Sequence, residues 1–286
     1  MRIFRLICVL LFCFCALYVI GGSIDAFQKK GQTVLKVSWP SRDARKSKSF
    51  DLDSVEEMGL TNLTGQDPHF NKQLNYSGIL VSKLISSISD SDKIERLRFY
   101  AADDYQVEIP VDLLKRYPVL LATRIEGKRW NEGDVWLFGP DRINLGPLYL
   151  VFPNIDYKDE KDLSYVGNWI FSVKSIDLLQ SGEGLAKVTT SHPADERARQ
   201  GMELFVKHCS HCHQIFSQGG KKGPALDKIA ASRSADYLKR YIIDPQAVVP
   251  AATMPRVSEW GPNFGEQEAD AIVAYLEYLG AGKKKD

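Results

Sequence analysis

The chain has 286 residues, which is enough for two domains of ordinary size that each bury a core. It carries 37 Lys and Arg residues against 36 Asp and Glu residues, so its net charge of +1 excludes a protein that binds nucleic acid through a large basic surplus. Hydrophobic residues make up 44% of the chain, which excludes a disordered protein.

The first residues have the pattern of a targeting segment. Arg2 and Arg5 precede an uncharged, apolar run at residues 6–20, and small residues follow, which is the order found in secretory signal peptides. When the run is extended through Ile24 it approaches the length of a membrane span, so an uncleaved anchor is the alternative. We predict that residues 1–26 are a signal peptide or N-terminal anchor and that the rest is exported to the periplasm. The membrane is then contacted only through this segment, if it stays uncleaved.

Residues 27–179 alternate strand-like runs with turn-forming residues. The runs RLRFYA, YQVEIP and GPLYLVFP are rich in β-branched and aromatic residues, and SKLISSI reads as a short helix. This alternation predicts a mixed α+β domain. The polar stretch QSGEGLAKVTTSH, at 180–192, is predicted to be a flexible linker to a second domain at 193–286.

The stretch VKHCSHCHQIF places three histidines and two cysteines close together. Cys209 and Cys212 are the only cysteines beyond the targeting segment, and their spacing serves zinc sites, redox dithiols and covalently attached haem. A zinc site needs a second pair of ligands, which the exported part of the chain does not offer as a motif. A thioredoxin-like pair follows a strand, whereas the charged helical run DERARQGMELFVKH precedes this one.

Haem attachment is the interpretation that this spacing favours. C-x-x-C-H lets Cys209 and Cys212 anchor the porphyrin through two thioethers, and the next residue, His213, then reaches the iron. His208 and His211 are not placed to reach the iron and are predicted to be surface residues.

Met254 is the methionine placed to be a sixth ligand of the iron. It lies well after the C-x-x-C-H motif, in an irregular segment confined by Pro250 and Pro255, which would hold its sulfur at a fixed place. The alternative is a methionine that fills a gap in the core.

Several C-terminal segments resemble the class I c-type cytochromes. The pattern G-x3-F-x3-C-x-x-C-H starts at Gly201, GKKGPALD resembles their Gly-Pro-x-Leu loop, and YLKRYIIDPQAVVPAATMP and EADAIVAYLEYLG resemble their later helices and Met loop. The resemblance implies an all-α cytochrome c domain with one covalent haem c. It also implies that the Pro224 carbonyl orients His213 and that Leu226 covers the haem. Gly201 would let the entry helix cross the last helix near Tyr275.

A second set of segments lies in residues 27–179. FDLDSVEEMGL, YSGILVSKLI, DDYQVEIPVDLLKRYPVLLATRIEGK, GPLYLVFP and NWIFSVKSIDL resemble, in that order, the molybdopterin-binding fold of the sulfite oxidase family in its short exported form. Catalytic members of that family hold molybdenum through a cysteine thiolate, and this segment contains no cysteine. The resemblance therefore implies an α+β molybdopterin-oxidoreductase-like domain that is catalytically silent and without cofactor.

Together these patterns predict an exported monohaem c-type cytochrome with His213 and Met254 on the iron, which exchanges electrons with a protein donor and a protein acceptor. The N-terminal domain would be a docking or structural module. One alternative is an oxidoreductase whose N-terminal domain binds a molybdenum cofactor and passes electrons out through the haem. Another is a haem sensor or peroxidase in which Met254 is displaced. Electron transfer is preferred over catalysis, and whether the chain is an enzyme stays open.

Overall fold

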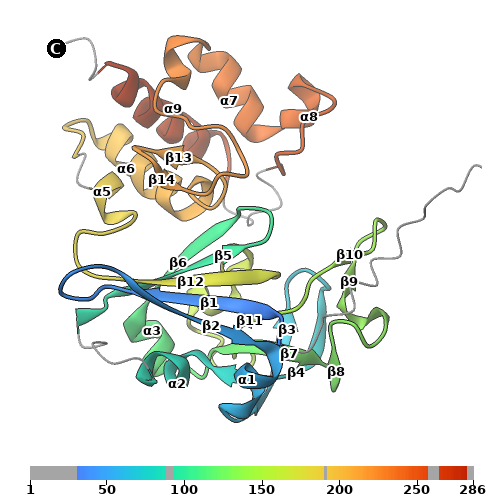
Figure 1. The fold of residues 1–286 in the computed structure, drawn as a ribbon. Coiled ribbons are helices and arrows are strands. Elements are labelled where there is room, and N and C mark those ends of the chain that lie inside the picture. The colour runs from blue at the N-terminus through green and yellow to red at the C-terminus, as the bar shows by residue number, and fades with distance from the viewer. Residues whose placement is uncertain (1–30, 88–92, 190–191, 257–263, 282–286) are drawn as a thin grey trace, which may run out of the picture.

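The computed structural model describes residues 31–87, 93–189, 192–256 and 264–281. They form a sheet-rich N-terminal unit and a mainly helical C-terminal unit that lies on one side of it (Figure 1). The targeting segment predicted at 1–26 lies outside the described residues. Within the described ranges, no helix combines the length and the apolar character needed to span a bilayer.

The N-terminal unit contains a mixed five-stranded sheet in the order β2-β1-β12-β5-β6. The strands are β2 (Lys46–Asp51), β1 (Thr33–Trp39), β12 (Val173–Leu179), β5 (Arg96–Ala101) and β6 (Gln106–Pro110). β1 runs parallel to β12, and the other neighbours are antiparallel. The runs RLRFYA and YQVEIP thus form neighbouring strands, and β6 is an edge strand.

A second, antiparallel sheet has the order β11-β7-β4-β3, with β8 paired to β7. Its strands are β3 (Thr61–Asp67), β4 (Lys72–Leu80), β7 (Leu120–Ile125), β8 (Lys128–Arg129) and β11 (Tyr149–Val151). The short helices are α1 (Leu52–Glu57), α2 (Val81–Ser86), α3 (Val111–Arg116) and α4 (Lys161–Ser164), and β9 (Leu137–Phe138) and β10 (Ile143–Asn144) form a separate hairpin. One hydrophobic core draws side chains from both sheets. The unit is therefore the mixed α+β domain that the sequence predicts.

The C-terminal unit consists of four helices around its own core, with one small hairpin. The helices are α6 (Glu196–Leu204), α7 (Ala235–Ile243), α8 (Pro245–Val248) and α9 (Glu266–Ala281), and the hairpin joins β13 (Gln214–Ile215) to β14 (Gln218–Gly219). The expectation of an all-α domain is therefore wrong in this detail. The chain reverses through Phe216 and Ser217, which both have positive φ, and this tight turn pairs the flanking residues as strands.

Helices α6 and α9 pack closely because α6 carries a glycine at their crossing. A Cβ added to Gly201 would collide with the backbone carbonyl oxygen of Ala271. The close approach lies at Ala271, one helical turn before the predicted Tyr275. Tyr275 instead packs its ring 6.0 Å from that of Phe205, at the next contact along the crossing.

The predicted flexible linker is ordered over its described part. It contains α5 (Ala186–Thr189), and Leu185 and Val188 are buried in the core of the C-terminal unit. The Leu185 N–H donates to the Glu108 carboxylate at 3.1 Å, which ties the segment to β6. The expectation of flexibility is wrong because the stretch also contains the apolar residues Leu185 and Val188, whose side chains pack in the core of the C-terminal unit.

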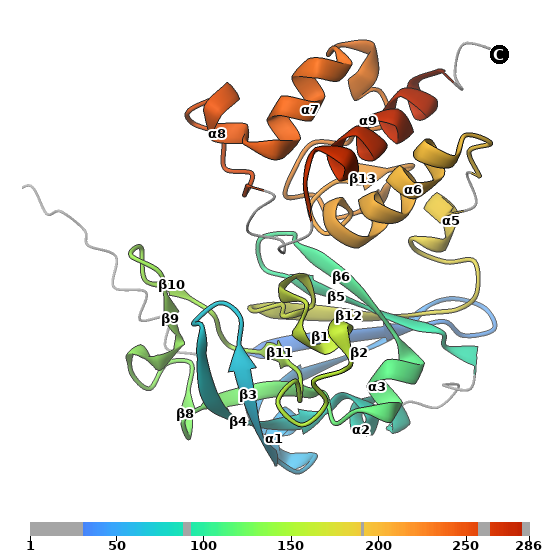
Figure 2. The same ribbon diagram turned by 180° about the vertical axis from the view of Figure 1, so that it is seen from behind.

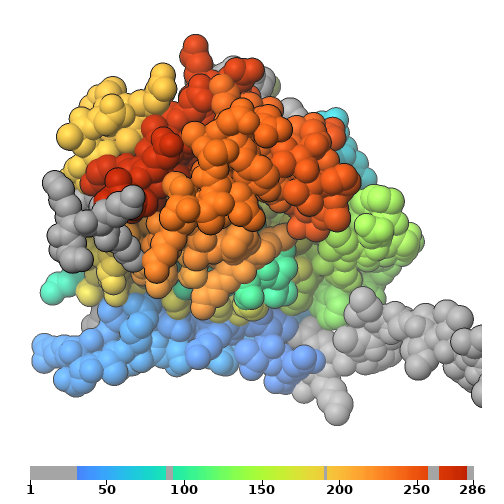
Figure 3. Space-filling view, turned by 90° about the horizontal axis from the view of Figure 1, so that it is seen from above, coloured from blue at the N-terminus to red at the C-terminus, as the bar shows by residue number. Residues whose placement is uncertain are grey.

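The two units contact each other through the β5–β6 turn and the segment after α4, both of which face the C-terminal unit (Figure 2). Seen from the side of the C-terminal unit, α7, α8 and α9 form the upper face and the β1–β2 hairpin emerges below them (Figure 3). The interface lies at the segment that contains Cys209 and Cys212.

Candidate functional site

Helix α6 delivers the two cysteines. Asp195 caps its N-terminus, since the side chain accepts a hydrogen bond from the Ala198 N–H at 2.9 Å. After Leu204 the helix widens into one turn of π-helix, Phe205–Cys209, and the Ser210 N–H donates to the Phe205 carbonyl at 2.9 Å. A π-helical turn is a local irregularity that often accompanies a functional site.

Cys209, Cys212 and His213 lie on one tight turn. The N–H groups of Cys212 and His213 both donate to the Cys209 carbonyl, at 3.1 and 2.9 Å. The two thiols do not form a disulfide. Burial raises the pKa of the Cys209 thiol to about 12 and that of Cys212 to about 11. A redox dithiol needs a lowered thiol pKa, so these environments do not favour that alternative.

The imidazole of His213 has a defined orientation. Its Nδ1 lies 2.8 Å from the Pro224 carbonyl oxygen, and because a carbonyl only accepts, Nδ1 carries the proton. This tautomer leaves a lone pair on Nε2, which is the atom a metal would bind. Desolvation lowers the pKa of His213, although the Pro224 hydrogen bond opposes it, so the neutral ligand form is favoured. Gly223 makes room for the ring, since a Cβ there would collide with it.

Leu226 lies in the same loop as Pro224. Its N–H donates to the Gln214 carbonyl at 2.9 Å, next to His213 in the chain, and its side chain packs against the C-terminal core. The structure thus places the Pro224 carbonyl against His213 and Leu226 in the same loop, and the role of Leu226 in covering the haem stays a prediction.

Met254 comes from a separate loop after α8, and that loop is tied down on both sides. The Gln246 side-chain amide donates to the Ala252 and Met254 carbonyls at 3.0 and 2.8 Å. The Arg256 guanidinium reaches the Asp244 carboxylate at 3.0 Å. Met254 is half-buried. Sequence reasoning missed Gln246, for which only its position before the proline-flanked segment is a signal.

His211 is buried and His208 is half-buried, so the prediction that both are surface residues is wrong. His211 is 7% exposed, and its ring stacks on Tyr105 with centroids 5.3 Å apart. His208 Nδ1 lies 2.8 Å from the Tyr165 hydroxyl. Burial lowers the pKa of each histidine to about 4, so both are neutral at pH 7. Their partners lie in the N-terminal unit, far away in the sequence, and no local pattern reports them.

A family comparison assigns this part of the chain. Residues 198–280 match the cytochrome c family model. The C-terminal unit is a cytochrome c domain. The domain carries a covalently bound haem c, and the chain is multidomain, with the cytochrome c domain following the sheet-rich unit. The match covers less than half of the chain and says nothing of the N-terminal unit.

Comparisons with solved structures add little to this assignment. The sulfane dehydrogenase SoxCD from Paracoccus pantotrophus aligns at 14% identity and a TM-score of 0.36, over 50% of this chain and 38% of that one. A cytochrome c from Rhodothermus marinus aligns at 20% identity and a TM-score of 0.26, over 35% of this chain and 99% of that one. An engineered form of the same protein aligns at 24% identity and a TM-score of 0.24, over 34% of this chain and 96% of that one. No curated protein matches the chain. TM-scores this low do not extend the assignment beyond the family match.

The residues present fit the haem. Two unpaired thiols lie on the turn that ends in an imidazole with a free Nε2 lone pair, which is the donor set that covalent attachment and axial ligation require. The described residues contain no group of three or more His, Cys, Asp or Glu side chains arranged to hold a metal ion, so the zinc alternative finds no ligand set among them.

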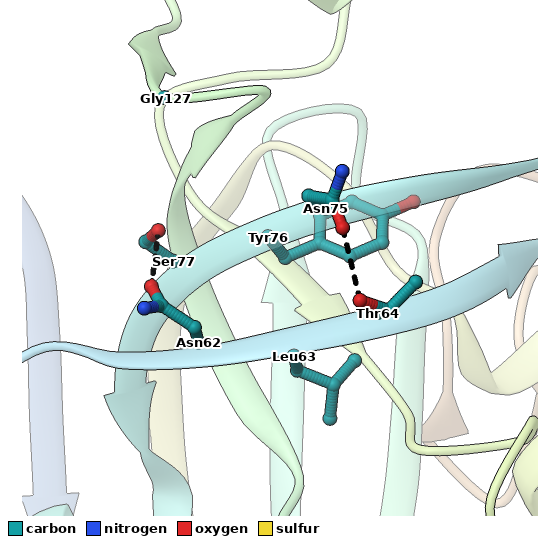
Figure 4. Close-up of a pocket in the computed structure, with 7 residues that line it drawn as sticks. All are labelled: Asn62, Leu63, Thr64, Asn75, Tyr76, Ser77 and Gly127. Carbon is teal, nitrogen blue, oxygen red and sulfur yellow. Dashed lines mark hydrogen bonds between the residues drawn. The ribbon is translucent and has the colours of Figure 1, made fainter.

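A shallow pocket of about 330 Å³ lies elsewhere, on the β3–β4 hairpin of the N-terminal unit (Figure 4). Its polar side chains pair with one another: Ser77 donates to the Asn62 side-chain oxygen at 2.8 Å, and Thr64 to that of Asn75 at 2.9 Å. None of the lining residues is a cysteine, a histidine or an acid, so the pocket offers no strong ligand to a metal cofactor.

Proposed function

We propose that this chain is an exported c-type cytochrome that carries single electrons between a protein donor and a protein acceptor in the periplasm. Residues 1–26 would be its signal peptide or anchor. One observation carries the proposal: the Pro224 carbonyl holds Nδ1 of His213 on the same turn that presents Cys209 and Cys212. Such a turn attaches a haem and fixes one axial ligand at once.

Each residue has a distinct role in this proposal. The haem iron supplies the one-electron chemistry by cycling between two oxidation states. Cys209 and Cys212 would hold the group covalently through thioethers, and His213 and Met254 would be its iron ligands. The thioether of Met254 favours the reduced iron and raises the potential. With His213 and Met254 as ligands, no substrate would need to reach the iron, and electrons would enter and leave through contacts with other proteins.

The N-terminal unit serves as a docking or structural module in this proposal. It contains no cysteine to bind molybdenum, and its contacts with the attachment turn are extensive. Partners are redox proteins, recognised through surfaces of either unit.

The full chain, exported in a host that matures c-type cytochromes, tests the proposal. Denatured protein should keep its haem through acid–acetone extraction, and Cys212→Ala should reduce or abolish haem attachment. Release of all haem from the wild type would overturn the covalent assignment.

Metal analysis of the same sample separates electron transfer from the molybdenum alternative. We expect one iron per chain and no molybdenum. Molybdenum near one per chain would replace the proposal with an oxidoreductase that uses the haem as its electron outlet.

A further inference from the structure

The turn between β5 and β6 binds the backbone of the haem-attachment region. The Gln106 N–H donates to the His211 carbonyl at 3.0 Å, and the Lys221 N–H donates to the Asp104 carbonyl at 3.1 Å. One hydrogen bond therefore ties the edge strand β6 to His211, between the cysteines, and the other ties the β5–β6 turn to the loop after β14. Hydrogen bonds in both directions fix the register between the two units.

Two tyrosines of the N-terminal unit close over the same segment. The Tyr105 ring stacks on His211 at 17° between planes, and its hydroxyl donates to the Gly167 carbonyl at 2.8 Å. Tyr165 pairs with His208, and its hydroxyl also lies 3.1 Å from the Lys207 carbonyl oxygen. Burial raises the pKa of both tyrosines, as expected for rings enclosed between the two units.

The two acidic side chains of the β5–β6 turn are paired with lysines. Asp103 forms an ion pair with Lys222, and Asp104 forms one with Lys174 at 2.9 Å. These pairs balance the charges of Asp103 and Asp104, and the Lys207 ammonium lies over the Tyr165 ring at 5.6 Å. The contact also excludes water from the segment around the cysteines. Ser210, between the two cysteines, is 1% exposed.

A second set of contacts prevents the units from swinging apart. The buried Glu108 carboxylate accepts from Arg98 and from the Leu185 N–H, so it joins β5 and β6 to the interdomain segment. Arg98 also donates to the Gln218 side chain, in the β13–β14 hairpin, at 3.3 Å. The tyrosines are thus held in place from both ends of the interface.

Excluding water at this position should change the reduction potential of the haem in one direction. The oxidised haem carries one more positive charge than the reduced haem, so a less polar surrounding disfavours the oxidised form. We propose that the N-terminal unit is a built-in shield that raises the reduction potential of the haem, with the stack of Tyr105 on His211 as its central contact. This inference rests on the proposed function and gives the N-terminal unit a role within it.

The test compares single substitutions in the full chain. Tyr105→Ala removes the stacked ring, Tyr105→Phe keeps the ring and loses only the hydroxyl, and Tyr157→Ala removes an exposed tyrosine that packs on Tyr117, away from the cysteines. The measurements are the reduction potential by optical titration and amide hydrogen exchange over residues 207–213.

We expect Tyr105→Ala to lower the potential and to speed exchange over 207–213 by about fivefold, as loss of a local contact increases opening. Tyr105→Phe should stay close to the wild type, and Tyr157→Ala should match it. Faster exchange with an unchanged potential would overturn the shield, and so would a lower potential with unchanged exchange.

If Tyr105→Ala does not fold, Tyr165→Ala opens the His208 side of the same interface and should change both measurements in the same direction. An unchanged potential in that variant would also overturn the inference. Failure of the proposed function is distinguishable, because the wild type would then lack covalent haem before any variant is made.

Discussion

At the scale of single residues, the orientation of His213 depends on two neighbours in one loop. The Pro224 carbonyl fixes the tautomer, and Gly223 leaves the space that the ring fills. The resemblance to c-type cytochromes predicted the first contact. It did not single out Gly223, because a glycine in a motif does not show which side chain needs its space.

Met254→Ala tests the sixth ligand. Haem attachment should persist, because it depends on the cysteines. The sulfur-to-iron charge-transfer band of the oxidised protein should disappear and the potential should fall, since water or a harder side chain replaces the thioether. Met202→Ala is the control: Met202 is buried in the core, so the variant should lose about 2–5 kcal/mol of stability and keep the band. The reverse pattern would refute the assignment.

Gln246→Ala tests whether the ties on the Met254 loop position the ligand. Removing the amide leaves the Ala252 and Met254 carbonyls without their donor, so the thioether should dissociate more readily. Carbon monoxide should then bind the reduced protein about tenfold faster, as for other losses of a partner behind a metal ligand. Gln73→Ala, on an exposed position of β4, should leave the rate unchanged. Equal rates in the two variants would show that Gln246 does not position Met254.

At the scale of elements, the sequence patterns predicted the strands whose residues favour β-structure locally. RLRFYA became β5 because its alternating apolar residues fit a half-buried strand. YQVEIP became β6, but there the polar residues Gln106 and Glu108 are buried as well, which the alternation did not predict. The β13–β14 hairpin escaped prediction, since strands of two residues have no pattern of their own and form only because the loop folds back onto the attachment turn.

Gly201→Ala tests the crossing of α6 and α9. The added Cβ would collide with the Ala271 carbonyl, so the helices must separate, at a cost of about 1–3 kcal/mol or more. Gly280→Ala is a matched control in α9, because its Cβ would lie at an ordinary 3.6 Å from that of Ala230. Helix propensity makes that control neutral or mildly stabilising. Thermal unfolding followed by the haem absorption measures both, and equal midpoints would contradict the crossing.

At the scale of the whole molecule, two units share one interface, and the segment between them belongs to it. Sequence reasoning separated the units but assigned their connection to a flexible linker and placed His208 and His211 at the surface. Both errors have the same cause: the partners of these residues, Glu108, Tyr105 and Tyr165, lie elsewhere in the chain and become neighbours only after folding.

Shortened chains test where the cytochrome c domain begins. A chain that starts at Gly182 keeps Leu185 and Val188, which are buried in the core, whereas one that starts at Ser191 loses both. Both should mature with the same haem spectrum, and the shorter one should be less stable by about 3 kcal/mol or more. The midpoints of chemical unfolding measure the difference. Equal midpoints would show that the α5 segment belongs to the N-terminal unit alone.

The interface also changes what the haem-binding motif has to encode. Covalent attachment leaves the two residues between the cysteines chemically unconstrained, yet here the N-terminal unit binds one of them, His211, through both its ring and its carbonyl. His211 therefore contributes to the fit between the two units in addition to its place in the haem-binding motif. If another cytochrome c domain were fused to this N-terminal unit, it would need a flat, neutral ring at the position of His211 to stack on Tyr105 in the same way.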